Sequence, residues 1–374
     1  MELAVIRRQL HRIAEVSGAE YQTAAFVADF LRPLQPAVLL TGLGGTGVCA
    51  TFDSGEQGPH LLFRAELDAL PIQEINSFSY TSLSPGVSHK CGHDGHTTIL
   101  LGLALSLSGK PIRRGRVSLL FQPAEETGEG AAAVLADPAF EAIQPDRVYA
   151  LHNVPGYPLG ELLIRTGSIT AAVKSMVIAF SGKTAHAAEP EHGKNPAGVL
   201  ARILLALDEL SQPDTDRSDF QLITPVHAVL GEKAYGVSAG HASLHLTLRA
   251  WTNEQMELVV AALEKRISEI CGESDIGYAV SWTNVFEANT NDTELAKELA
   301  LLAAAAGTPV TMLSQPFKWG EDFGYFTQRY RGLFLGLGSG ESCPALHNPD
   351  YDFPDALLDK GVGLFRLLVE ATLA

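Results

Sequence analysis

The sequence predicts an α/β protein that carries a second, smaller domain as an insertion. Short apolar runs of strand type alternate with helical patterns in residues 1–168 and again in residues 289–374. Residues 169–288 follow the order strand–helix–strand–strand–helix–strand, which is that of a ferredoxin-like split βαβ unit. We therefore expect residues 1–168 plus 289–374 to form one α/β domain, and residues 169–288 to form an inserted α+β domain of the kind that acts as a lid or a dimerisation domain.

The α/β domain is predicted to begin with two helices within residues 1–34, the second near residues 20–34. Strand-like runs follow at residues 37–41, 47–52, 60–67, 116–121, 147–151 and 333–337.

A Gly-rich segment, Gly42 to Gly47, matches the G-x-G-x-x-G pattern of dinucleotide-binding proteins. That pattern indicates a nucleotide site only when a helix follows it. Here Val-Cys-Ala-Thr-Phe and another Gly-rich turn follow. We therefore predict a hairpin connection, with a dinucleotide site as the second alternative.

Composition narrows the possible partners and the compartment. The chain has 46% hydrophobic residues and a formal net charge of −16, with no run of Lys and Arg, so nucleic acid and anionic membranes are not expected partners. No apolar run is long enough to span a bilayer, and the first residues lack a signal-peptide core. The four cysteines show no disulfide spacing, which favours reduced thiols in a cytoplasmic protein.

The segment Ser88 to His96, with the sequence SHKCGHDGH, places a thiol, three imidazoles and a carboxylate within nine residues. Cys91 and His93 are two apart, and residues two apart in an extended loop point the same way. We therefore place both on a loop, where they could reach one metal ion, and predict a buried helix over residues 97–108. A polar loop with chance histidines is the alternative, but the chain has only 12 His and 4 Cys.

Polar side chains also follow several predicted strands. Asp68 follows the strand at residues 60–67, a glutamate pair follows residues 116–121, and His152 follows residues 147–151. Taken alone, each of these polar residues could lie in a solvated loop or at the start of a helix. Because the ends of strands in an open α/β sheet are where sites form, we expect four strand ends to carry one composite metal site. The four sets of residues, with His347 as a fifth candidate near the C-terminus, are Asp68, Cys91/His93, Glu125/Glu126 and His152.

The inserted domain is predicted from its own alternating pattern. Strands are expected at residues 173–180, 221–230, 242–251 and 276–286, with helices at residues 196–210 and 254–271. Asn195 and Pro196 form a suitable N-cap and first-turn pair for the first helix. His186 precedes it in a polar loop, and taken alone it would be a surface histidine.

Taken together, these motifs occur in the order and spacing of one known family. The chain resembles the hippuricase-like amidohydrolases, which include N-acyl-amino-acid aminoacylases and plant hydrolases of auxin–amino acid conjugates. They are a branch of the aminoacylase/glutamate-carboxypeptidase clan of di-metal peptidases. The motifs that carry the resemblance are FRAELDALP, HKCGHDGHT, FQPAEETGEGA, LHN, KTAHAAEPEHGKNPA, EDFGYF and LHNPDYDF.

The resemblance implies a site with two divalent metal ions and a metal-activated water that cleaves the amide bond. Glu125 matches the general base, Asp68 the carboxylate that orients a ligand imidazole, and His186 a histidine of the inserted domain that reaches the partner subunit's active site. The donor types favour zinc, with Mn²⁺ or Co²⁺ as alternatives. The residues that match the metal ligands, with the Cys91 sulfur shared between the ions, are Cys91, His93, Glu126, His152 and His347.

The resemblance further implies a di-metal peptidase-like catalytic domain, a homodimer, and an N-acyl amino acid as the substrate. A dipeptidase or carboxypeptidase acting on small peptides is one alternative, and a degenerate metal-binding regulatory protein is another. Two departures from the family pattern bear on the substrate. Glu66 stands where relatives usually carry Asp, and the segment Tyr235 to Ala239 replaces an Asn-Val-Ile-Pro-like stretch.

Overall fold

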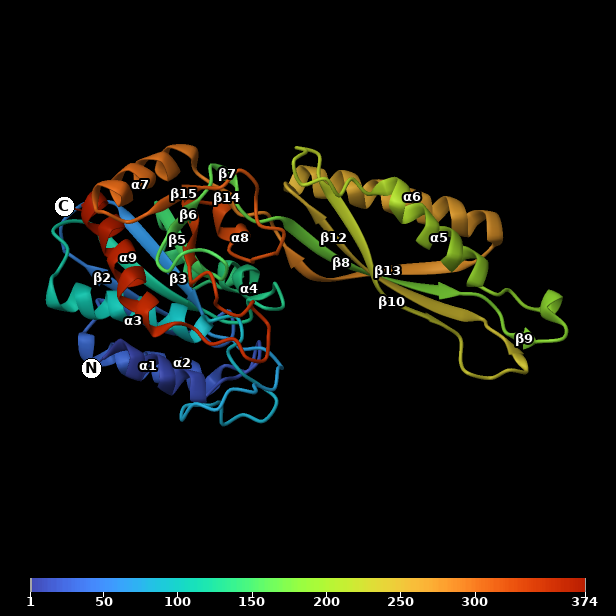
Figure 1. Ribbon diagram of the computed structural model, residues 1–374, viewed down its shortest axis with the longest axis horizontal. Helices are drawn as coiled ribbons and strands as arrows, with labels where there is room; N and C mark the ends of the chain where they lie inside the picture. The colour runs from blue at the N-terminus through green and yellow to red at the C-terminus, as the bar shows by residue number, and fades with distance from the viewer. Residues whose placement is uncertain (1, 374) are drawn as a thin grey trace. The chain divides into compact units, whose positions relative to one another are not determined.

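The structure is a computed structural model that describes residues 2–373, and the chain divides into two compact units (Figure 1). Unit 1 comprises Met1–Ile169, Asn289–Ser314 and Glu321–Ala374, and unit 2 comprises Thr170–Ala288 and Gln315–Gly320. The segment Gln315–Gly320 groups with unit 2 because Phe317 forms a β-bridge with Thr170.

Unit 1 is built on an eight-stranded mixed sheet with the order β1-β2-β4-β3-β5-β16-β6-β15. Its central strand β3 runs parallel to β4 and β5, and β5 runs parallel to β16, so the carboxyl ends of these strands meet at one edge. The predicted α/β class is confirmed. The strands are β1 Val38–Leu43, β2 Gly47–Asp53, β3 His60–Glu66, β4 Arg116–Gln122, β5 Arg147–Val154, β6 Leu162–Ile164, β15 Val310–Met312 and β16 Arg331–Gly338, beside the small ladder of β7 Gly167–Ser168 and β14 Thr290–Asn291.

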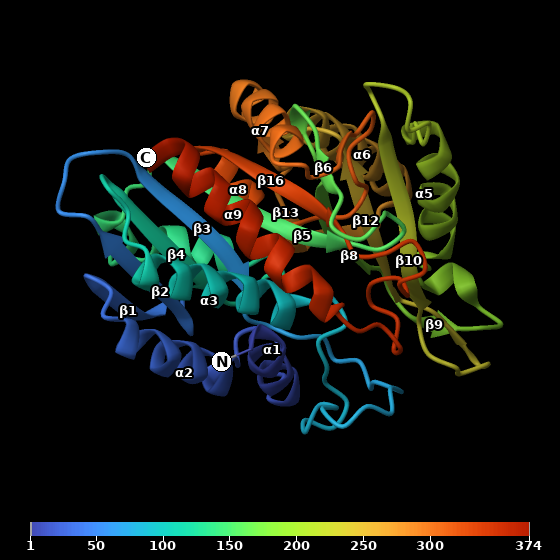
Figure 2. The same ribbon diagram turned by 60° about the vertical axis from the view of Figure 1, so that its left-hand side comes forward.

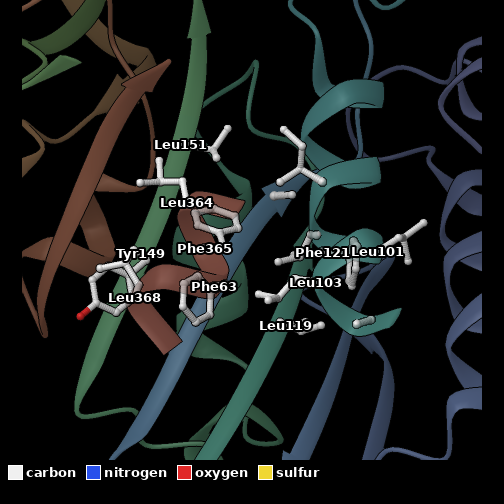
Figure 3. Packing of buried hydrophobic residues seen from close by; sticks show 14 of the residues in the cluster. Phe63, Leu101, Leu103, Leu119, Phe121, Tyr149, Leu151, Leu364, Phe365 and Leu368 are labelled. Atoms are coloured by element: carbon white, nitrogen blue, oxygen red, sulfur yellow. The ribbon is translucent and has the colours of Figure 1, made fainter. Parts of the chain in front are cut away.

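Helices cover this sheet, and α3 and α9 lie side by side across it (Figure 2). Phe63 of β3 stacks on Tyr149 of β5 with 5.2 Å between ring centroids, and Phe365 of α9 lies 4.9 Å from Phe63 (Figure 3). Each such buried side chain contributes about 1.5–3 kcal/mol to folding. The helices are α1 Leu3–Arg12, α2 Tyr21–Leu31, α3 His93–Gly109, α4 Gly130–Ala136, α7 Thr293–Ala305, α8 Gly324–Thr327 and α9 Leu358–Leu373, with short 3-10 turns at Arg32–Leu34, Phe140–Ala142 and Asp355–Leu357.

The Gly-rich segment connects β1 and β2 as an antiparallel hairpin, as predicted. Gly42, Gly44 and Gly45 all have positive φ angles, and a Cβ on Gly44 would lie 2.7 Å from the Val134 nitrogen. Glycine is therefore required here by the turn and by close packing on α4, and the segment does not open a nucleotide-binding helix.

Unit 2 contains a four-stranded antiparallel sheet with the order β10-β12-β8-β13 and two helices, α5 and α6, packed on one face. β12 alternates buried and partly exposed residues along its length, as expected for a sheet with one covered face. The elements follow the predicted order. They are β8 Ala172–Ser181, β9 Ala185–His186, α5 Ala197–Leu210, β10 Gln221–Leu230, β11 Val237–Ser238, β12 His241–Ala250, α6 Asn253–Ser274 and β13 Gly277–Phe286, with a 3-10 turn at Pro190–His192.

One capping prediction in unit 2 was wrong by a single residue. Pro196 occupies the N-cap position of α5, and the helix begins at Ala197. The Asn195 side chain still accepts a hydrogen bond from the Ala197 amide at 2.9 Å, so it satisfies a backbone donor from one position further out. Among residues 2–373, no helix is long and apolar enough to cross a membrane.

Candidate metal centre and active site

The segment with Cys91 and His93 is a loop that turns directly into a helix. α3 begins at His93, so the prediction that both residues lie on a loop was wrong for His93, and the helix starts four residues earlier than expected. Gly92 between them has a φ angle of 95°, in the left-handed region. This reversal of the backbone lets a loop residue and a first-turn helical residue converge, which is why glycine stands there.

The strand-end prediction also needs correction for this pair. Cys91 and His93 follow a long connection after β3 and do not follow a strand. The other sets do follow strands or lie in them: Asp68 lies just beyond β3, the glutamate pair lies in the turn after β4, and His152 lies within β5.

Asp68 holds the His93 ring from behind. Its backbone oxygen lies 2.9 Å from His93 Nδ1, and its Oδ1 lies 3.4 Å from the same nitrogen. The other oxygen, Oδ2, accepts from the Ser17 hydroxyl at 2.7 Å and from the Glu126 amide at 2.9 Å. Asp68 therefore fixes both an imidazole and the glutamate turn, and it directs His93 Nε2 away from the strand.

Glu125 and Glu126 project from a turn that follows β4, after Ala124 with a φ angle of 50°. Each has a carboxylate oxygen 3.8 Å from His93 Nε2. Glu126 also reaches the C-terminal loop, because its Oε2 lies 3.8 Å from His347 Nε2. These adjacent glutamates thus face the same imidazole, while Glu126 alone connects it to His347.

His152 and His347 complete the cluster from two other segments. His152 Nδ1 lies 2.8 Å from the Asn153 carbonyl oxygen, and its Nε2 lies 3.4 Å from Cys91 Sγ. His347 is held by its backbone, whose amide donates to the Lys90 carbonyl at 2.8 Å, and its φ angle of 64° turns the chain at that point. The structure therefore brings together all the predicted ligand residues of unit 1.

The donor atoms are spaced for metal ions. His93 Nε2 and Glu126 Oε1 are buried and have no hydrogen-bond partner, although they lie 3.8 Å apart. Orphaned buried polar atoms are costly, and ligands of one ion bound at about 2.0–2.3 Å lie about 3–4 Å from each other. The triads whose donor atoms lie within 4.8 Å of one another include Cys91/His93/His152, Cys91/Glu126/His347 and His93/Glu125/Glu126. These residues fit bound metal.

The pKa shifts of the two glutamates and the thiol also favour a bound cation. Burial, with Glu321 and Glu126 nearby, raises the pKa of Glu125 well above its usual range, and burial raises the pKa of Glu126 to about 7. Burial and the surrounding acids also raise the pKa of the Cys91 thiol. Raised pKa values favour the protonated form of these three groups. A divalent ion would supply the missing positive charge and leave the thiolate and carboxylates free to ligate.

The family model for peptidases of family M20/M25/M40 matches residues 62–371. The chain belongs to this peptidase family. The predicted resemblance is thereby confirmed, and so is the prediction of an amide-hydrolysing enzyme.

Relatives of this M20/M25/M40 peptidase match over nearly its whole length. It is 30% identical to N-acetyldiaminopimelate deacetylase of Bacillus velezensis, over 97% of each chain. It is 29% identical to hippurate hydrolase of Campylobacter jejuni, over 98% of this chain and 95% of the relative. A Bacillus subtilis structure described as a dinuclear metal-binding peptidase of the M20 family superimposes with a TM-score of 0.83 at 24% identity, covering 98% of this chain and 96% of the other.

A buried ionic cluster lies beside the glutamates of this peptidase, and the sequence alone assigned it no role. The Arg64 guanidinium bonds to Glu66, lies 2.9 Å from Glu321 Oε1 and 2.6 Å from Asp322 Oδ1, and is fully buried. Burial raises the pKa of Asp322 to about 8 despite this neighbour. The signal was present in the EDF motif at residues 321–323, because two acids in an otherwise apolar run need a buried partner.

His186 lies in unit 2, in the short strand β9, and its side chain is exposed. Its Nδ1 accepts a hydrogen bond from the Ala188 amide at 3.1 Å, which fixes the ring orientation. β9 pairs with β11, so His186 is opposite Val237. The segment Tyr235 to Ala239, noted as a departure from the family pattern, is therefore the strand partner of the histidine loop.

Proposed function

We propose that this enzyme hydrolyses the amide bond of N-acyl amino acids, using two divalent metal ions bound by one cluster of side chains. The convergence of the Cys91 thiol with imidazole and carboxylate donors at one sheet edge carries the proposal. The activities named for the deacetylase and hippurate hydrolase relatives support this substrate class. The proposed ligands are Cys91, His93, Glu126, His152 and His347.

When bound, the ions would polarise the scissile carbonyl and lower the pKa of the attacking water. Mixed thiolate, imidazole and carboxylate donors favour zinc, and Mn²⁺ or Co²⁺ are the alternatives. Asp68 contributes by holding His93 through Nδ1, which directs Nε2 to the ligand position.

Glu125 is the proposed proton carrier. It lies next to a proposed ligand, is 6% exposed, and its carboxylate approaches the His93 ring without a hydrogen bond to it. A buried carboxyl with a raised pKa suits a group that first takes a proton and then gives it away. Glu125 would accept the proton of the attacking water and deliver it to the nitrogen of the leaving amino acid.

The substrate experiment uses the full chain reconstituted with Zn²⁺, Mn²⁺ or Co²⁺ and a panel of N-acetyl, N-benzoyl and indole-acetyl amino acids beside dipeptides. We expect turnover of the acyl amino acids, loss of activity on chelation, and recovery when metal is restored. Faster turnover of the dipeptides would reassign the enzyme as a dipeptidase. Full activity in protein that contains no metal by elemental analysis would refute the metal-dependent mechanism.

We further propose a homodimer in which His186 serves the partner subunit and donates a hydrogen bond to the substrate carbonyl oxygen. This proposal rests on the family resemblance and on the exposed, orientated ring of His186. Loss of one such donor costs about 10²–10³-fold in kcat.

A mixing experiment tests the role of His186. The inactive variants Glu125→Gln and His186→Ala are combined under conditions of proven subunit exchange. If His186 acts in trans, mixed dimers contain one site with both groups intact and activity returns. No recovery excludes the role in trans, and a fully active His186→Ala protein excludes any role. Sedimentation of the wild-type protein as a monomer would also contradict the proposal.

A further inference from the structure

His96 is a buried histidine that the proposed ligand set leaves out, although it lies between two of the ligands. Its ring centroid is 4.7 Å from that of His152 and 5.6 Å from that of His93, and the residue is 1% exposed. It is the last residue of the SHKCGHDGH segment and lies in the first turn of α3. Its position raises the question of whether it ligates metal or holds the residues that do.

Both ring nitrogens of His96 are already engaged by protein atoms. Nδ1 lies 2.7 Å from Glu66 Oε2, and Nε2 lies 2.6 Å from Asn153 Oδ1. The Glu66 carboxylate is in turn held by Arg64 through its other oxygen. Although donor atoms of Glu66, His93 and His96 lie within 4.8 Å of one another, those of Glu66 and His96 are directed at each other. His93 Nε2, by contrast, has no hydrogen-bond partner among the described residues.

Asn153 connects His96 to three parts of the metal centre. Its backbone carbonyl oxygen lies 2.8 Å from His152 Nδ1, and its side-chain Nδ2 donates to the Tyr351 hydroxyl at 2.6 Å. The same side chain packs on Gly92, where a Cβ would lie 2.4 Å from Asn153 Oδ1 and 3.0 Å from the Tyr351 oxygen. Asn153 thus contacts the residue between Cys91 and His93, as well as His152 itself.

We propose that His96 is a positioning residue of the metal centre. Held by Glu66, it fixes Asn153, and Asn153 fixes the His152 ring and the Gly92 turn from which two ligands project. Side chains that orient metal ligands from behind are worth about 10–100-fold in metal affinity or activity. One Glu66 carboxylate thus contacts both Arg64 and His96. This inference rests on the proposed metal-binding function.

The test measures Co²⁺ binding by the full chain, by competition with a chelator and by the cobalt absorption spectrum. We expect His96→Gln to bind Co²⁺ about 10–100-fold more weakly than wild type, with a changed spectrum and still two ions at saturation. Tyr351→Phe removes only the hydroxyl that Asn153 contacts, and we expect a smaller loss in the same direction. His60→Gln is the matched control, because His60 is a buried histidine at the opposite end of β3, hydrogen-bonded to Ser118.

Several results would overturn the inference. Wild-type affinity and spectrum in His96→Gln would make His96 a packing residue, and saturation at one ion would make it a ligand. If His96→Gln does not fold, wild-type affinity and spectrum in Tyr351→Phe would refute the connection through Asn153. An equal loss of affinity in His60→Gln would also refute it. If the wild-type protein binds Co²⁺ but cleaves no acyl amino acid, the substrate assignment fails while these affinities still decide the role of His96. If it binds no Co²⁺, both proposals fail.

Discussion

The two units bury very different side chains. Among residues 2–373, every buried charged or histidine residue belongs to unit 1, and Thr170 is the one buried polar residue of unit 2. The core of unit 2 consists of aliphatic and other apolar side chains between its sheet and helices α5 and α6. Unit 1 has an apolar core as well, but it also contains a fully buried Arg64 with acidic partners at the edge of the sheet.

The contrast in buried charge bears on how each core contributes to stability. An apolar core gains stability in proportion to the area it removes from water, whereas buried ion clusters gain little or nothing over apolar residues of the same size. A gain in stability therefore does not explain the buried charge of unit 1. The comparison predicts that substitutions of charged residues have large effects in unit 1 and small effects in unit 2, and four experiments test it.

The largest effect is expected at Glu125. Glu125→Gln keeps the shape of the side chain and removes its ability to carry a proton, so kcat should fall by about 10²–10⁴-fold while metal content stays normal. Steady-state kinetics with elemental analysis checks this. Glu126→Gln should instead weaken metal binding. Glu273→Gln, on the exposed face of α6, is the unit 2 control and should leave kcat unchanged. Near-normal turnover in Glu125→Gln would place the base elsewhere.

A large loss of stability is expected when Arg64 is removed. Arg64→Met leaves buried acidic partners without a cation, and breaking a buried ion pair in this way costs about 3–5 kcal/mol. Urea denaturation of the metal-free variant and wild type measures the difference in the free energy of unfolding. A difference below about 1 kcal/mol would show that the cluster relaxes or takes up protons at little cost.

A pH-dependent loss of stability, of intermediate size, is expected from the protonation of His60 in acid. Burial, together with the Arg116 guanidinium, lowers the pKa of His60 to about 4. Because the unfolded chain, with a histidine pKa of about 6.5, binds this proton more readily than the folded chain, stability falls as pH drops from about 6.5 towards 4. Between pH 7 and pH 5, the free energy of unfolding should therefore fall by about 1–2 kcal/mol less in His60→Gln than in the wild-type protein.

The exposed His241 of unit 2 provides the control for this pH effect. His241→Gln should follow the wild-type curve of unfolding free energy against pH. If His60→Gln and wild type lose equal stability on acidification, other groups account for the acid sensitivity of unit 1.

The smallest effect is expected for an ion pair of unit 2. Arg202 on α5 lies 2.6 Å from Glu273 on α6, but both side chains are about half exposed. Exposed pairs of this kind contribute about 0–1 kcal/mol and are screened by salt. Arg202→Ala should change the urea midpoint little, and less at high salt. A loss comparable with that of Arg64→Met would contradict the contrast between the two units.

The sequence by itself determined the α/β class, the order of the longer strands and the family. Period-2 and period-3.6 patterns predicted β8, β10, β12 and β13 of unit 2 and β1 to β5 and β16 of unit 1, because each of these elements must present one apolar face to a core. The strands of only two or three residues, β6, β7, β9, β11, β14 and β15, were not predicted, because they are too short to show a period. Polar residues that follow apolar runs, such as Asp68 and Glu125, predicted the sheet edge where the candidate site lies. The hairpin at Gly42 followed from the absence of a subsequent helix.

The tertiary structure decided which of these residues meet and what holds them. α3 begins at His93, directly after the left-handed Gly92. Local periodicity could not indicate this start, because Asn153 and Tyr351, which pack on Gly92, are distant in the sequence. Two acidic partners of Arg64, Glu321 and Asp322, lie more than 250 positions away in the chain, so no local pattern predicted their contact. His96 belongs to the same nine-residue segment as His93, and the contacts of its two ring nitrogens distinguish it from that residue.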